Sequence, residues 1–269
     1  MMRKITAAGY VTTDFYPDFD NRFYVTGNGV NVIINLLQMR KDVKASVVSA
    51  VSDDEYGKAA LAKFSEMGID CSHLEVIPGG ETPRVPLYLV DNERTYGTPV
   101  RGVMGDYEFS DEAVDFICEH EIMLSDFTGK LMGRLKEIKE RGVKIFFDLS
   151  TRRDREDVDS VLENCYCCLA SFEKGEEDKA HEFLEHAVAL GTHIALATFG
   201  SDGSMAYDGK NFYRHGIEKA EKVVNTVGAG DSYFSGFISG FLDEKPIEEC
   251  MAEGAKRSAI IVSVFDPYL

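Results

Sequence analysis

Short apolar runs rich in β-branched residues alternate along this chain with longer segments in which apolar residues recur at helical spacing. Strands are expected at residues 4–11, 45–51, 121–126, 143–150, 166–171 and 192–200. Helices are expected at 29–39, 54–68, 111–120, 129–142 and 176–191, followed by a hairpin at 204–214 and two C-terminal helices. This alternation predicts an α/β fold with a mostly parallel sheet and helices on both faces.

Two segments break the alternation. Residues 14–27 are aromatic and acidic, and residues 73–97 contain short strand-like runs with turns at Pro78-Gly79-Gly80 and Asp91-Asn92. We interpret segments at roughly 15–26 and 73–97 as strands that leave the main sheet and form a small β lid on a single domain of residues 1–269. The alternative is that they are edge strands of the main sheet, because strand propensity does not say which sheet a strand joins.

Composition narrows the class of protein. The 269 residues carry 46 acidic against 29 basic side chains, a net charge of −17, which argues against nucleic acid and anionic membranes as partners. The N-terminus turns polar before a signal sequence would be complete, so a cytoplasmic location is expected. Cys165, Cys167 and Cys168 have no metal-ligand spacing and are interpreted as buried thiols of a core strand.

The stretch VVNTVGAGDSYFSGFISGFL (223–242) places two glycines and a carboxylate at the start of an apolar helix. Backbone N–H groups in a first helical turn lack internal partners and carry the positive end of the helix dipole, so they can bind an anion such as phosphate. Asp231, placed beside that anion, is positioned to accept a proton from an attacking hydroxyl.

The residues alone leave a second interpretation open. Gly228 and Gly230 can simply close a tight loop while Asp231 occupies the first turn for helix stability. Two absences limit the chemistry: no GxxxxGK[ST] phosphate loop occurs, and GYVTTD follows the first strand where a dinucleotide fold would have GxGxxG.

NTVGAGDSYFSGF resembles the C-terminal signature of the ribokinase/PfkB family of carbohydrate kinases. GYVTTDFYP, TGNGVNVIINL, SAVSDDEYG with LAKFSEMGID, and ATFGSDGSMAYDG resemble other segments of that family in the same order. The similarity spans essentially the whole chain and, among subfamilies, is greatest to the fructoselysine kinases. It implies a ribokinase-like fold and transfer of the γ-phosphoryl group of ATP, with Mg²⁺, to a hydroxyl of a sugar or ketose-amine.

The resemblance also implies roles for individual residues. The general base is Asp231, with Gly228, Ala229 and Gly230 as the anion hole. The acceptor sugar is expected to contact Asp14, Gly27, Asn31, Arg94 and Arg101, although surface exposure of the two arginines is an equal alternative. The nucleotide is expected at Thr198, Gly200, Gly203, Thr226, Gly254 and Ser258, although 200 and 203 can be ordinary turn glycines.

Some positions depart from the family pattern. Asn225 stands where an aspartate usually helps to hold a monovalent cation, which puts potassium activation in doubt. Ser171 replaces the asparagine of the family's NxxE element, so Glu173 is the candidate carboxylate for Mg²⁺, with Glu176 as the alternative. Both can equally be solvent-facing charges at the start of the next helix.

Three alternatives remain: a kinase for another ketose, a kinase for a nucleoside, and a non-catalytic sugar- or nucleotide-binding regulator. The intact GAGD argues against the regulator, because a protein that only binds needs no base. Exposed lid strands offer edges for a second copy of the chain, so a homodimer through the lid is a further hypothesis.

Overall fold

The larger sheet contains most strands of this computed structural model. The structure describes residues 2–90 and 93–269, and for residues 89, 90, 93 and 94 it describes the backbone alone. Within the described residues the order of the larger sheet is β13-β12-β11-β10-β9-β8-β1-β4-β5. Neighbouring strands from β11 to β5 pair in parallel, and β12 and β13 are antiparallel. The strands are β1 (Arg3–Ala8), β4 (Val43–Ser52), β5 (Asp70–Ile77), β8 (Ile122–Asp126), β9 (Lys144–Ser150), β10 (Cys167–Ser171), β11 (Ile194–Thr198), β12 (Ser204–Tyr207) and β13 (Phe212–His215).

A smaller sheet has the order β3-β2-β6-β7 in the described part of the chain. Its strands are β2 (Thr12–Tyr16), β3 (Arg22–Thr26), β6 (Arg84–Val90) and β7 (Glu93–Tyr96). Tyr56, on a neighbouring helix, meets Phe15 and Phe23 edge-on at ring-centroid distances of 6.4 and 5.1 Å. Tyr16 packs on Phe265 near the C-terminus, so this sheet is joined to the rest of the molecule by aromatic contacts.

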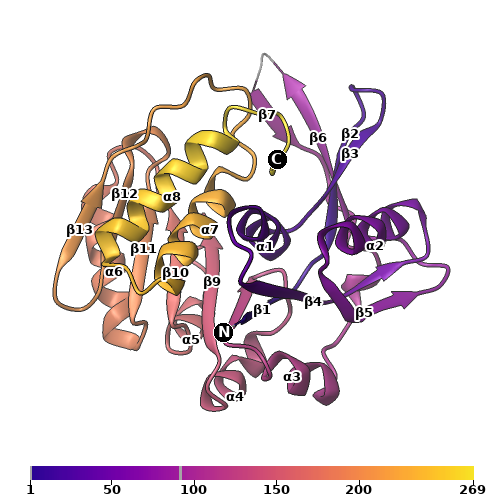
Figure 1. Cartoon of the computed structure of the whole chain (residues 1–269), viewed down its shortest axis with the longest axis horizontal. Coiled ribbons are helices and arrows are strands. Elements are labelled where there is room, and N and C mark those ends of the chain that lie inside the picture. Colours follow the sequence, from indigo (N-terminus) through magenta and orange to yellow (C-terminus); the bar gives the residue numbers. More distant parts are fainter. Residues whose placement is uncertain (1, 91–92) are drawn as a thin grey trace.

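The main helices cover both faces of the larger sheet (Figure 1). Along β9, Phe146 belongs to the apolar core beneath one set of helices, whereas Ile145 and Phe147 belong to the core on the opposite face. The first set is α1 (Asn28–Met39), α2 (Glu55–Met67), α7 (Ala229–Leu242) and α8 (Ile247–Ile261). The second is α3 (Asp111–Ile117), α4 (Leu135–Glu140), α5 (Val158–Leu162) and α6 (Glu177–Leu190).

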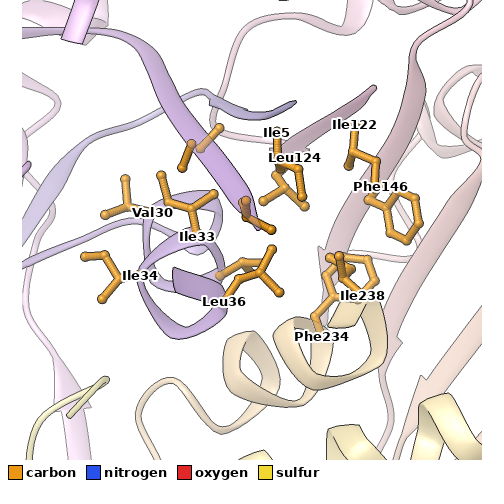
Figure 2. Close-up of a cluster of buried hydrophobic side chains, with 14 of the residues drawn as sticks. Ile5, Val30, Ile33, Ile34, Leu36, Ile122, Leu124, Phe146, Phe234 and Ile238 are labelled. Carbon is orange, nitrogen blue, oxygen red and sulfur yellow. The ribbon is translucent and has the colours of Figure 1, made fainter. Parts of the chain in front are cut away.

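Helices α1 and α7 pack side by side over the centre of the sheet (Figure 2). Ile33 and Leu36 of α1 face Phe234 and Ile238 of α7 across an apolar cluster. A hydrogen bond from the Ser235 hydroxyl to the carbonyl of Val32, at 3.1 Å, joins the two helices. Their N-terminal turns therefore lie beside each other.

The expected fold class is confirmed, and three local expectations need correction. The segment at 129–142 is a short 3₁₀ turn (Met132–Arg134) followed by α4 rather than one helix. Helix α5 was not expected from the sequence. Residues 73–77 belong to β5, which pairs with β4 at the edge of the larger sheet, so that part of the expected lid segment lies outside the smaller sheet. None of the helices in the described ranges is both long and apolar enough to cross a membrane.

Candidate active site

The first turn of α7 presents an uncapped helix end. Gly228 has the left-handed φ of 72°, and no side chain caps the helix. The N–H of Ala229 donates to the carbonyl of Thr226 at 3.2 Å, so that one of the three expected anion-hole donors already has a partner within the turn. A Cβ placed on Gly230 would meet no atom within 4 Å, which leaves open space for an anion against this turn.

Asp231 lies one residue further along the same turn and is joined to α1. The side-chain amide of Asn31 donates from Nδ2 to Oδ2 of Asp231 at 2.8 Å. Asn31 itself is only 4% exposed, and its Oδ1 has no hydrogen-bond partner among the described residues. A buried amide with one unused acceptor indicates that a ligand carrying a donor completes this site.

The electrostatic environment of Asp231 is acidic. Burial raises its pKa well above the usual carboxyl range, and the carboxylates of Asp148, Asp126 and Asp14 raise it further. The hydrogen bond from Asn31 acts in the opposite direction by stabilising the charged form. A carboxyl group of this kind holds a proton more readily than an exposed aspartate does, which suits a general base.

Asp126 is the last residue of β8 and pairs in register with Asp148, which lies two residues before the end of the neighbouring parallel strand β9. Asp148 accepts hydrogen bonds from Nδ2 of Asn28 at 2.9 Å and from the N–H of Ser150 at 2.7 Å. Burial raises the pKa of Asp148 to about 6, and the Asp126 charge adds to that effect. Carboxyl ends of parallel strands are where open α/β sheets bind ligands.

Gly27 and Asp14 border the same region from α1 and the smaller sheet. Gly27 precedes α1 with φ of 128°, and a Cβ there would lie 2.2 Å from the carbonyl oxygen of Tyr10. Glycine is therefore required where the chain enters α1. Asp14 is a half-buried residue of β2, close enough for its charge to affect Asp231.

The residues expected at the nucleotide occupy two regions. Thr198 ends β11 with its hydroxyl 3.5 Å from that of Ser171, and Gly200 and Gly203 form the turn into β12 with φ of 55° and 93°. A Cβ on Gly200 would meet nothing within 4 Å, whereas one on Gly203 would lie 2.2 Å from the carbonyl of His215. Exposed Thr226 lies in the loop before α7. Gly200 therefore borders open space, while Gly203 serves the hairpin.

The remaining nucleotide candidates lie on α8. Gly254 is buried, and a Cβ there would lie 2.8 Å from the carbonyl oxygen of Tyr233 on α7. Its missing side chain thus serves the contact between the two helices. Ser258 is half-buried one turn further along α8.

The positions that depart from the family pattern have definite partners. Asn225 is buried, donates from Nδ2 to the carbonyl of Phe265 at 2.6 Å, and accepts from the N–H of Val227 at 3.0 Å. An aspartate there could accept from Val227 but could not donate to Phe265. Glu173 is exposed on the loop after β10, and Glu176 pairs with Arg153 at 2.9 Å. The Glu176 carboxylate is thus already engaged in an ion pair.

Arg101 is exposed just before a 3₁₀ turn (Gly102–Gly105), and its charge lowers the pKa of Tyr10, which burial raises overall. The side chain of Arg94, the other arginine expected at the substrate, lies outside the described part of the structure. Arg152 lies near Asp148 and opposes the rise in its pKa.

Two side chains of this region, Asn28 and Asp126, were missing from the site expected on sequence. Asp126 follows the apolar run of its strand, as Asp148 follows Phe146 and Phe147, so a position near the carboxyl end of a strand was an available signal. Asn28 has no such signal, because its contact with Asp148 joins residues 120 positions apart.

A phosphate group fits this site at the uncapped first turn of α7, where Gly230 leaves open space. No cluster of three or more His, Cys, Asp or Glu side chains in the described residues is arranged to hold a metal ion. Mg²⁺ commonly binds through substrate phosphates and water, so such a cluster is not required for it.

Comparisons with known proteins identify the family. The model of the pfkB family carbohydrate kinases matches residues 2–268. The chain is 29% identical to a fructoselysine 6-kinase of Shigella flexneri, over 96% of this chain and 97% of the relative. A fructosamine kinase of Bacillus subtilis (strain 168) is 23% identical, over 98% and 93%.

Solved structures show the same fold. The ribokinase of Arabidopsis thaliana, complexed with ribose and ATP, superposes with a TM-score of 0.81 at 17% identity, covering 99% of this chain and 94% of that one. A nucleoside kinase of Methanocaldococcus jannaschii gives 0.76 at 22% identity, with coverage of 98% and 93%.

Proposed function

The chain belongs to the pfkB family of carbohydrate kinases, and we propose that it transfers the γ-phosphoryl group of ATP to a hydroxyl of a ketose-amine such as fructoselysine. The observation that carries the proposal is the pairing of Asp231 with Asn31 at the uncapped first turn of α7. Similarity to fructoselysine 6-kinases supports the choice of acceptor.

Asp231 acts as the general base. Its carboxylate takes the proton of the acceptor hydroxyl as the hydroxyl oxygen forms a bond to the γ-phosphorus, and the bond from that phosphorus to the bridging oxygen of ADP breaks. The raised pKa of Asp231 matches this role, because a more basic carboxylate accepts the proton more readily. Asn31 holds the carboxylate toward the acceptor through its 2.8 Å hydrogen bond.

The backbone of Gly228, Ala229 and Gly230 stabilises the charge that develops on the transferring group, with the N–H of Ala229 shared with the carbonyl of Thr226. Donors at a helix start are fixed before the reaction and carry the positive end of the dipole, so they need no reorganisation. Mg-ATP, when bound, supplies the phosphoryl group and the cation that neutralises its charge.

The smaller sheet, with Asp14 and Gly27 at its border, holds the sugar. Thr12 and Thr26 pair across β2 and β3, and neither hydroxyl has a hydrogen-bond partner among the described residues. Such donors and acceptors suit sugar hydroxyls, and a sheet over the site keeps water from the reacting centre.

The test measures ADP release from Mg-ATP with a panel of ketoses, ketose-amines including fructoselysine, and nucleosides. We expect stimulation by a ketose-amine and a decrease of about 10²- to 10⁴-fold in Asp231→Asn, since that variant keeps the shape of the side chain without its basicity. Stimulation by a nucleoside alone would exclude the ketose-amine. ATP binding without stimulation by any member of the panel would favour a non-catalytic regulator.

A further inference from the structure

Asp126 and Asp148 form a pair of carboxylates that no cation neutralises within the described residues. Asp126 is 5% exposed, and neither Asp126 nor Asp148 forms an ion pair within the described residues. The side chain of Asp126 accepts hydrogen bonds at Oδ1 from the N–H and the hydroxyl of Thr128. The partners of Asp148 are the N–H of Ser150 and the side-chain amide of Asn28, which are neutral.

Buried like charges at the ends of adjacent strands are costly. Paired residues on neighbouring strands lie about 5 Å apart, and carboxylates in low-dielectric surroundings need a positive partner. The positive charge of Arg152 lowers the pKa of Asp148, but burial outweighs it.

A second observation indicates a ligand at Asp231, whose pKa the charges of Asp148 and Asp126 help to raise. The side chain of Asn31 belongs to a residue that is only 4% exposed. Its Nδ2 donates a hydrogen bond to Asp231, and its Oδ1 has no hydrogen-bond partner among the described residues. Hydrogen-bond acceptors at this site thus come from three strands and two helices, so a ligand that is rich in hydrogen-bond donors would complement it. The ketose-amine proposed as acceptor carries such donors on its protonated nitrogen, so both its charge and its hydrogen-bonding groups match this region.

We propose that Asp126 and Asp148 bind the protonated amine of the ketose-amine acceptor and so select it over neutral ketoses. The inference rests on the proposed function and extends it to the residues that determine specificity. A secondary ammonium group donates two hydrogen bonds, one to each carboxylate, and its charge offsets their repulsion. A sugar with only hydroxyl groups leaves that repulsion in place.

A matched pair of ligands isolates this interaction. 1-Deoxy-1-methylaminofructose and 1-O-methylfructose differ in one group, a protonated nitrogen in the first and an ether oxygen in the second. Isothermal titration calorimetry with wild-type protein is expected to show the amine binding at least 10-fold more tightly, since hydrogen bonds to charged groups contribute about 1.5–3 kcal/mol.

The variants Asp126→Asn and Asp148→Asn, made separately, test the two residues. Asparagine keeps Oδ1 as acceptor for Thr128 or Ser150, so the local turns are retained while the charge is lost. We expect the preference for the amine over the ether to fall about 10-fold or more in each variant. Asp70→Asn is the control, because Asp70 accepts an analogous bond from the N–H of Ser72 at the start of β5.

The outcomes separate the two proposals. An unchanged preference in both variants, or equal wild-type affinity for the two ligands, would overturn the amine subsite while leaving the kinase intact. Wild-type protein that binds neither ligand and phosphorylates no ketose-amine would overturn both. Thermal unfolding of each variant confirms that the protein titrated is folded.

Discussion

At the residue scale, one hydrogen bond joins the two helices that build the site. Asp231 comes from α7 and Asn31 from α1, which are 200 positions apart in the chain. The family resemblance predicted both residues, but their direct contact required the structure. Burial, with the acidic neighbour Asp148, then raises the pKa of Asp231.

The pH dependence of turnover follows from that environment. A general base works only when ionised, and burial together with the Asp148 charge raises the pKa of Asp231. With neutral 1-O-methylfructose as acceptor, kcat/KM should fall on acidification with a midpoint above the ordinary carboxyl value of about 4. Asp148→Asn removes one repelling charge, so its midpoint should move to lower pH. The same midpoint in wild type and variant would contradict this electrostatic account.

Two glycine substitutions should have opposite consequences. In Gly27→Ala the new methyl group meets the Tyr10 carbonyl at 2.2 Å in a backbone with φ of 128°, so the variant should lose about 1–3 kcal/mol of unfolding free energy in urea titrations. In Gly230→Ala the new methyl group meets no atom within 4 Å, so the free energy of unfolding should be retained.

Gly230→Ala should nevertheless lower kcat/KM for ATP by about 10²-fold, since the methyl group occupies the space assigned to phosphate. Unimpaired kinetics in this variant would show that phosphate does not approach the turn there.

At the scale of elements, glycines allow α7 and α8 to pack closely together. A Cβ on Gly236 would lie 2.3 Å from the carbonyl oxygen of Glu253, and one on Gly240 would lie 2.9 Å from Cα of Cys250. The spacing of apolar residues in the sequence predicted both helices. Their close packing was not predicted, because glycine has no side chain and so adds nothing to a hydrophobic pattern. Short α5 was missed for a similar reason, since five residues are too few to show a helical repeat.

Gly236→Ala should separate the two helices and destabilise the protein by about 1–3 kcal/mol, as overpacked interiors generally do. Gly133→Ala is the control, because a Cβ there meets nothing within 4 Å. Chemical denaturation followed by circular dichroism measures both. A stable Gly236→Ala variant would mean that α8 can shift at little cost.

At the scale of the whole molecule, alternation of strands and helices was sufficient to predict a mostly parallel sheet covered on both faces. It could not assign the edge strands. Strand β5 pairs with β4, whereas β6 joins the smaller sheet, although the segment 73–97 contains residues of both. That choice depends on tertiary contacts such as those of Tyr56 with Phe15 and Phe23. The net charge of −17 is similarly uninformative about the site, because the phosphate binding proposed there uses local backbone donors.

The most direct test of the account is to follow the γ-phosphoryl group itself. The protein is incubated with fructoselysine and ATP labelled with ³²P at the γ position, and the products are separated and identified by mass spectrometry. We predict one labelled phosphate ester on a sugar hydroxyl, formed by wild-type protein and nearly absent with Asp231→Asn. Label found only as inorganic phosphate, or transferred equally well by the variant, would contradict the assignment of Asp231 as the base of a sugar kinase.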